Sequence, residues 1–239
     1  MLIYNKDAEL SFQEFINISN EEGAAVLIDK AVGWTSFDVV AKLRRIVNVK
    51  KIGHCGTLDP FATGLLILCL AKSTKRIVDF QSLPKQYAAT IKLGATTPSF
   101  DTETEEENEV DVQSIQSLYI EEIVKSFVGN IQQTAPAYSA KKVGGKKRAY
   151  ELARKGREVI IAPSDVEIYS IDITKIALPF VDIVVNCGKG TYIRALARDI
   201  GEKLGVGGYL TALRRTKIGE YDTATAWTIS ELVEKSGVI

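Results

Sequence analysis

The apolar run at residues 65–71 constrains the fold of this chain more than any other feature of its sequence. Its letters are LLILCLA, and it comes directly after a glycine-rich stretch at 53–64. The run is far shorter than the roughly 20 residues that span a bilayer. A short apolar run bounded by turn signals is typical of a strand that is buried on both faces. We therefore expect residues 65–70 to form the central strand of a sheet.

The rest of the chain mixes further strand and helix patterns without a regular βαβ rhythm. Strands are expected at 24–28, 87–93, 166–173 and 181–185. Three helices are expected. The first is capped by Thr35/Ser36 and carries Val39, Leu43, Ile46 and Val47 on one face. The second runs along 120–128 and stops at Gly129, and the third runs from Thr191 to Gly205. This mixture favours the α+β class, with helices on the faces of a sheet, over a doubly wound parallel fold. With no linker and no internal repeat, we expect an N-terminal extension at 1–22 and a single domain at 23–239.

Charge is balanced in total, with 30 Lys+Arg against 30 Asp+Glu, but it is separated along the chain. Residues 1–22 carry a net charge of −4 and residues 101–111 carry −7, which leaves +11 on the remainder. We expect the two acidic segments to be solvated or disordered. The basic residues cluster at 42–51, 72–76, 141–157 and 189–217. Such clusters can bind the phosphates of a nucleic acid. Charge alone does not distinguish this function from that of ordinary helix faces exposed to solvent, and it favours neither.

Cysteine and histidine usage limits the chemistry. Cys55, Cys69 and Cys187 show no CxxC spacing, and His54 is the only histidine, so the usual Cys/His zinc arrangements cannot be assembled. We interpret the cysteines as reduced structural thiols and expect no metal site. The N-terminus has acids among its apolar residues and no signal-peptide pattern, which favours a cytoplasmic protein. Catalysis is expected to depend on carboxylate, Tyr, Lys or Arg side chains.

The Asp59-Pro60 pair in the glycine-rich stretch is the strongest candidate for a reactive group. Proline keeps the preceding residue out of the helical region, so this loop can hold one carboxylate rigidly. Taken alone, Asp-Pro is more often a turn signal than a nucleophile. Three glycine-rich patterns, at 188–193, 205–208 and 145–147, are incomplete as phosphate loops. The sequence therefore gives no support for a nucleotide cofactor.

The stretch GHCGTLDPFATGLL at 53–66 resembles the catalytic motif of the TruB family of tRNA pseudouridine-55 synthases, Gly-His-x-Gly-x-Leu-Asp-Pro-x-Ala-x-Gly-x-Leu. The resemblance extends over roughly residues 23–232. Further matches follow in the expected order: Leu27-Ile28-Asp29-Lys30 with Gly33 and Ser36, Lys85-Gln86-Tyr87, Pro136-x-Tyr138-Ser139-Ala140-x-Lys142 with Gly145, Tyr150 and Glu151, residues 188–194, and Leu213-Arg214-Arg215. It implies a pseudouridine-synthase-like mixed, mainly antiparallel sheet flanked by helices. One departure is Ala31, where the family usually has proline.

The resemblance implies roles for six residues. Asp59 would be the catalytic nucleophile, by addition to either the base or the ribose, and Arg194 would favour its ionised form by pairing with it. Without the motif, a surface ion pair would be preferred for Arg194. Tyr87 would stack beside the target base. Its use as a proton acceptor is opposed by the phenol pKa of about 10, which would leave it neutral. The remaining substrate contacts implied are His54, Tyr192 and Leu213. The reaction implied needs no cofactor and no metal.

The partner implied is tRNA, bound through its T arm, with no membrane, no protein partner and a monomeric enzyme. The target uridine must be flipped out of the folded arm, at a cost of a few kcal/mol. Phosphate contacts could offset this cost, and the candidates are Lys141, Lys142, Lys146, Lys147 and Arg148. Only 22 residues follow Lys217, so we expect a bacterial-type member without the C-terminal RNA-binding domain.

Three functions are compatible with these residues. The first is an isomerase that makes pseudouridine 55 in tRNA. The second is an RNA-binding protein that helps tRNA fold and for which Asp59 is dispensable. The third is a pseudouridine synthase that acts on another RNA, because catalytic residues do not themselves encode the substrate.

Overall fold

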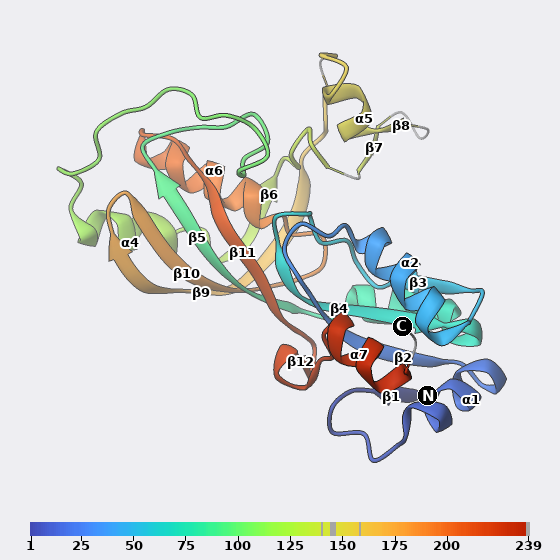
Figure 1. Cartoon of the computed structure of the whole chain (residues 1–239). Helices are drawn as coiled ribbons and strands as arrows, with labels where there is room; N and C mark the ends of the chain where they lie inside the picture. The colour runs from blue at the N-terminus through green and yellow to red at the C-terminus, as the bar shows by residue number, and fades with distance from the viewer. Residues whose placement is uncertain (140, 144–146, 158, 238–239) are drawn as a thin grey trace. The chain divides into compact units, whose positions relative to one another are not determined.

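The computed structural model describes residues 1–139, 141–143, 147–157 and 159–237 (Figure 1). The chain divides into two compact units, one made of Met1–Tyr87 and Arg214–Ile239 and the other of Ala88–Leu213. Strands β5 (Lys85–Leu93) and β11 (Gly208–Ile218) each begin in one unit and end in the other.

The first unit contains the whole N-terminal third of the chain and the C-terminal segment. Its strands follow the order β1-β2-β4-β11, with β3 paired to β4 and β12 paired to β11. The bounds of its elements are β1 Leu2–Tyr4, α1 Phe12–Glu21, β2 Ala24–Lys30, α2 Ser36–Val47, β3 Ile52–His54, β4 Thr63–Leu70, η1 Ala71–Arg76, α3 Ile77–Ser82, β12 Tyr221–Asp222, η2 Thr223–Thr225 and α7 Ile229–Ser236.

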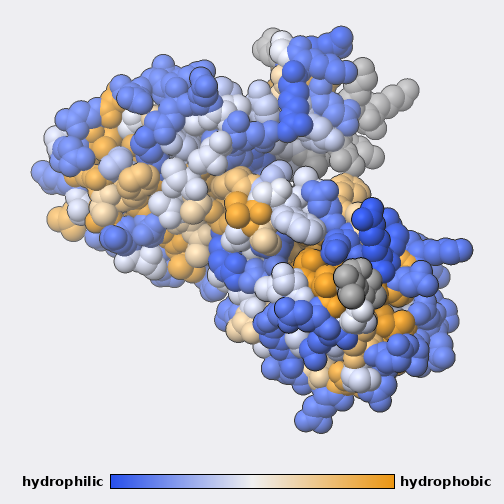
Figure 2. All heavy atoms as spheres, viewed as in Figure 1, coloured by the Kyte–Doolittle hydropathy of each residue, from blue (hydrophilic) through white to orange (hydrophobic). Residues whose placement is uncertain are grey.

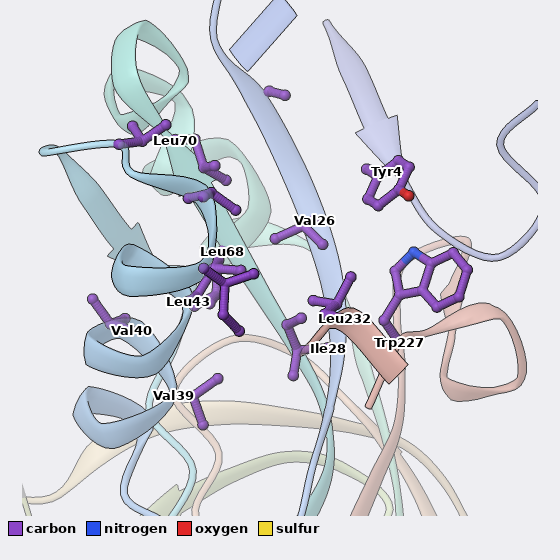
Figure 3. Packing of buried hydrophobic residues seen from close by; sticks show 14 of the residues in the cluster. Tyr4, Val26, Ile28, Val39, Val40, Leu43, Leu68, Leu70, Trp227 and Leu232 are labelled. Atoms are coloured by element: carbon purple, nitrogen blue, oxygen red, sulfur yellow. The ribbon is translucent and has the colours of Figure 1, made fainter. Parts of the chain in front are cut away.

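Strand β4 is the buried central strand that the apolar run predicts. One of its faces carries Leu66, Leu68 and Leu70, which join a core cluster with β2, α2 and α7. Figure 3 shows this cluster, which includes Leu43 of α2 and Leu232 of α7. Leu65, Ile67 and Cys69 project to the opposite face, into a second cluster that contains Phe80. Because both faces are covered, the strand reads as a continuous apolar run.

Residues 1–22 form part of this unit, so the expectation that they are solvated or disordered is wrong. Strand β1 pairs in parallel with β2, and α1 begins with a capping box between Ser11 and Glu14. The rings of Tyr4 and Phe15 are fully buried and stack with centroids 4.1 Å apart. The net charge of this segment lies on exposed positions, while two aromatic side chains supply the burial that keeps it folded.

The second unit continues the sheet order as β11-β5-β10-β9-β6, with a separate hairpin of β7 and β8. Strands β9 and β10 pair antiparallel along most of their length, and β6 pairs antiparallel with β9. The bounds of its elements are α4 Ser117–Lys125, β6 Gly129–Gln133, β7 Lys142–Val143, β8 Lys147–Arg148, α5 Ala149–Ala153, β9 Ser164–Ala177, β10 Phe180–Cys187 and α6 Ile193–Leu204.

The predicted elements are present, with differences at their ends. Helix α2 has Thr35 as its N-cap, and α6 ends at Leu204 with Gly205 as its C-cap, whose φ of 77° is left-handed. Helix α4 ends earlier than expected, at Lys125, because the amides of Phe127 and Val128 bond to carbonyls three residues back. The α+β class with a mixed, mainly antiparallel sheet is confirmed. Among the described residues, no helix combines the length and apolar character needed to cross a membrane.

Candidate active site

Asp59 lies in the loop between β3 and β4 of the first unit, and its side chain is half-buried. The loop leaves β3 at Cys55, whose amide donates to the carbonyl of Ile67 on β4 at 2.9 Å. It turns at Asp59, where the carbonyl accepts from the amide of Ala62 at 3.1 Å, and enters β4 at Thr63. The turn signal and the candidate nucleophile are thus the same residue.

Hydrogen bonds fix the backbone on both sides of Asp59. Before it, the hydroxyl of Ser36 accepts from the amide of Leu58 at 2.9 Å and donates to the Leu58 carbonyl at 3.2 Å. After it, the carbonyl of Pro60 accepts from the amide of Gly33 at 2.8 Å. Both partners come from the segment between β2 and the start of α2, which therefore packs against the loop. Rigid backbone of this kind is what a precisely placed catalytic carboxylate needs.

Lys30, at the end of β2, is only 1% exposed and adds a buried cation beside the loop. Its ammonium donates to the carbonyls of Ala31 at 3.0 Å, Trp34 at 2.7 Å and Pro60 at 3.4 Å. Burial lowers the pKa of Lys30 to about 8, and attraction to Asp59 opposes that decrease. The hydrogen bonds also stiffen the segment in which Ala31 replaces the family's proline.

His54 and Tyr87 lie in the same unit as Asp59. His54 is the last residue of β3, and its ring meets that of Phe37 edge-on, with centroids 5.3 Å apart. Tyr87 is largely buried on β5. The residue before it, Gln86, accepts a hydrogen bond from the hydroxyl of Thr216 on β11 at 2.9 Å. The ring contact with Phe37 orients His54, while the roles of His54 and Tyr87 toward a substrate stay predictions.

The cysteine interpretation is confirmed. Cys55, Cys69 and Cys187 are free thiols and all three are buried. The sulfur atoms of Cys55 and Cys69 lie 3.4 Å apart. The contact with Cys69 and the surrounding apolar groups raise the pKa of the Cys55 thiol, which keeps it protonated and unreactive.

Gly64, at the start of β4, is required by the packing of this loop. Its φ is +103°, and a Cβ there would lie 2.8 Å from the amide nitrogen of Arg215 and nearer still to its carbonyl oxygen. Gly33 has a φ of +82°, but a Cβ there would have nothing within 4 Å. At Gly33, glycine is therefore favoured only by the positive φ and not by the packing.

Gly64→Ala is therefore expected to destabilise the protein well beyond Gly33→Ala. The strain of a left-handed residue costs about 1–2 kcal/mol in both variants. Gly64→Ala adds a backbone clash, because β4 and β11 cannot separate without breaking their register. Thermal unfolding of the two variants measures the difference. Equal decreases in Tm would contradict this account of Gly64.

Arg194, near the start of α6 in the second unit, forms a buried ion pair with Asp101. The two side chains are 3% and 1% exposed, and Nη1 of Arg194 lies 2.9 Å from Oδ2 of Asp101. Arg194 also donates to the carbonyls of Ser99 at 3.0 Å and Tyr138 at 2.9 Å. The alternative of a surface ion pair is therefore wrong for Arg194. The role that the resemblance gives it toward Asp59 stays a prediction.

Asp101 is the exception to the expectation that residues 101–111 are solvated or disordered, since it is buried whereas most of the segment is exposed. Its Oδ1 accepts from the Ser99 hydroxyl at 2.6 Å and from the Glu103 amide at 2.8 Å. Further along, Lys92 binds Glu106, and Thr96 pairs with Glu107 through two backbone hydrogen bonds. The segment is ordered because its first carboxylate neutralises a buried arginine, a contact that charge composition cannot reveal.

Tyr192 and Leu213 belong to the second unit as well. Tyr192 is the N-cap of α6, and its amide donates to the side-chain carbonyl of Gln133 at 2.8 Å. Gln133 is itself buried at the end of β6. Gln133 lies three positions before Pro136, outside the matched motifs, so the sequence does not predict this contact. Leu213 is buried on β11.

The candidate phosphate contacts lie around the β7–β8 hairpin. Lys141 precedes β7, and its ammonium donates to the carbonyl of Ala162 at 3.4 Å. The backbones of Lys142 and Arg148 pair across the hairpin, and Lys147 lies in β8. Lys146 lies outside the described residues. In the view of Figure 2, the region of α5 next to this hairpin is covered by hydrophilic side chains.

Two family models match the chain. "TruB family pseudouridylate synthase (N terminal domain)" matches residues 44–193, and "tRNA pseudouridylate synthase B C-terminal domain" matches residues 194–237. The first match contains the Asp59 loop and the second begins at Arg194. The C-terminal match falls on α6, β11, β12 and α7, which are elements of the fold described above.

Similar proteins extend over nearly the whole chain. A protein of Chloroherpeton thalassium named tRNA pseudouridine synthase B is 48% identical over 225 residues, which are 92% of this chain and 93% of that protein. One of the same name from Parabacteroides distasonis is 52% identical over 204 residues, 83% of this chain and 86% of the relative.

Two solved structures contain chains that are similar to this one at lower sequence identity. A Cbf5-Nop10-Gar1 complex contains a chain that is 31% identical, with a TM-score of 0.70 over 92% of this chain. An H/ACA RNP bound to a substrate RNA containing 2'-deoxyuridine contains one that is 28% identical, with a TM-score of 0.67 over 92% of this chain. This chain spans 56% and 55% of those two chains, respectively.

Proposed function

The chain belongs to the TruB family of pseudouridylate synthases, and from this membership we propose that it converts uridine 55 in the T arm of tRNA to pseudouridine with Asp59 as the nucleophile. The enzyme is an isomerase. The N1–C1′ bond of uridine breaks, the uracil turns, and a C5–C1′ bond forms. The proton on C5 is lost and N1 gains one, so the product has the composition of the substrate.

The observation that carries this proposal is the anchored loop around Asp59. Ser36 binds the backbone of Leu58, and Gly33 and Lys30 bind the carbonyl of Pro60, so the carboxylate stands on a fixed segment. A nucleophile held in this way loses little entropy when it meets the flipped uridine. The buried Lys30 lies near enough to attract the Asp59 carboxylate, which favours the ionised, nucleophilic form.

Arg194, Tyr87, His54, Tyr192 and Leu213 have the roles that the family resemblance assigns to them. In this proposal Arg194 keeps Asp59 ionised and Tyr87 stacks on the uracil. His54, Tyr192 and Leu213 contact the displaced nucleotide, as unstacked bases require aromatic and apolar surfaces. No protein group in this scheme needs a metal or a cofactor.

RNA binding is assigned to the basic residues at 141–148, which would contact phosphates of the T arm. Their contribution should weaken as salt rises, because binding releases counterions. The proposed enzyme is a monomer in the cytoplasm that needs no protein partner and no membrane, and residues 23–239 are its catalytic domain.

Tritium release from C5-labelled uridine in a tRNA transcript tests the proposal. The wild-type protein is expected to release one tritium per tRNA, and to release none when uridine 55 is replaced by cytidine. No release from the normal transcript would contradict the isomerase activity. Release that persists from the altered transcript would favour a pseudouridine synthase with another target. Binding and refolding of tRNA without any release would favour a folding helper.

A further inference from the structure

Arg215, on β11, has no part in the proposed function so far, although its guanidinium reaches the Asp59 loop. The residue is 2% exposed. Its Nε donates to the carbonyl of Leu65 at 2.8 Å, at the start of β4. Its two terminal nitrogens lie 3.4 Å from the carbonyl oxygen of Thr57 and 3.3 Å from that of Gly56. One side chain therefore connects both ends of the loop.

The surrounding backbone leaves room for this side chain. Arg214 and Arg215 pair in parallel with Thr63 and Gly64 on β4. Gly64 lacks a Cβ where the Arg215 backbone approaches most closely. A Cβ on Gly56, whose φ is +111°, would lie 3.7 Å from Nη1 of Arg215. A glycine near each end of the loop thus lies against the arginine.

The partners of Arg215 also explain why an arginine is used. Within the described part of the chain, all of its hydrogen-bond partners are backbone carbonyls. A planar guanidinium presents several N–H donors in a fixed fork, whereas an ammonium is a point charge on a flexible stem. Only the fork can reach Leu65 in one direction and residues 56–57 in another. The adjacent Arg214 instead binds Asp29 through two hydrogen bonds, at 3.0 and 2.7 Å.

We infer that Arg215 is a positioning residue for the isomerase reaction, which acts by fixing the backbone of Gly56 and Thr57 and thereby the place of the Asp59 carboxylate. The inference rests on the proposed role of Asp59. Ser36 and Lys30 hold the loop immediately beside Asp59, and Arg215 holds the segment that precedes it. Without Arg215 the loop keeps its later anchors but loses the one that joins it to the start of β4.

The inference predicts a specific kinetic change. A displacement of about 1 Å in a catalytic group can cost about 100-fold in rate. Arg215→Lys keeps the charge but cannot form the fork, so kcat is expected to fall by about 100-fold. The KM for tRNA is expected to stay within about 3-fold, because a side chain that is 2% exposed cannot contact RNA phosphates.

Tritium release under steady-state conditions, together with thermal unfolding, tests the inference with two control variants. Lys6→Gln removes a cation of the same unit that lies outside the basic clusters, where the side chain is 35% exposed and the ammonium lies 2.6 Å from Glu231. Leu232→Ala opens a core cluster beneath α7 to which neither Arg215 nor residues 55–62 belong, and is expected to lower Tm. Both controls are expected to keep kcat when they are assayed at the same interval below their own Tm.

A loss of kcat in Arg215→Lys alone, with KM unchanged, would support a positioning role. Wild-type kcat in Arg215→Lys, a loss no larger than that of Leu232→Ala, or a change confined to KM would each overturn it. A wild-type protein that releases no tritium would overturn the proposed function and this inference together. An active wild type beside an unchanged Arg215→Lys variant would overturn the inference alone.

Discussion

Asp59→Asn is expected to abolish tritium release from tRNA, with a decrease in rate of about 10⁴-fold or more, the scale seen when an enzyme loses its nucleophile. Asparagine has the shape of aspartate but no negative charge and no nucleophilic oxygen of comparable strength. The loop itself should persist, because Ser36, Gly33 and Lys30 hold its backbone through atoms of residues 58 and 60. Loss of activity should therefore occur in a folded protein.

The measurement combines initial rates of tritium release with tRNA binding on filters and a thermal unfolding curve. Asp79→Asn is the matched control, since Asp79 is an exposed carboxylate of the same unit that pairs with Arg76 at 2.9 Å. That variant should keep wild-type activity. Asp59→Asn should bind tRNA normally and unfold near the wild-type Tm. Residual release above about 1% of the wild-type rate would contradict a nucleophilic role for Asp59.

Local pattern was sufficient to predict the element that carries the nucleophile. The apolar run at 65–70 predicts a strand covered on both faces, and β4 is covered by two core clusters. The helix start at Thr35 was also predictable, because its hydroxyl and Asp38 form a capping box three residues apart. Both signals come from residues that are close in sequence: the strand from its apolar side chains, and the helix start from the capping hydrogen bonds.

Contacts between distant residues were not predictable in the same way. Asp101 and Arg194 are separated by 93 positions, and nothing in the run of acids at 101–111 distinguishes the one carboxylate that is buried. The expectation that residues 1–22 are solvated or disordered failed for a similar reason. It was based on their net charge, which says nothing about the stacked, buried rings of Tyr4 and Phe15. Composition averages over a segment, whereas burial is decided at single positions.

The Asp101–Arg194 pair gives the second large expected effect. Asp101→Asn should destabilise the protein by about 3–5 kcal/mol, because it leaves a buried guanidinium without a counter-charge. Asparagine can keep the hydrogen bonds that Oδ1 accepts from Ser99 and Glu103, so the loss is mainly electrostatic. Urea unfolding measures the free energy. Glu103→Gln is the control in the same segment, and its exposed pair with Arg154 should contribute under about 1 kcal/mol.

The double variant Asp101→Asn/Arg194→Met separates stability from catalysis. Removing both charges relieves the uncompensated guanidinium, so part of the stability lost in Asp101→Asn should return. Tritium release should be lost in the double variant, since Arg194 is proposed to keep Asp59 ionised and methionine carries no charge. If the double variant kept wild-type release, the arginine would act only as a structural group, and the ionisation of Asp59 would depend on Lys30 within its own unit.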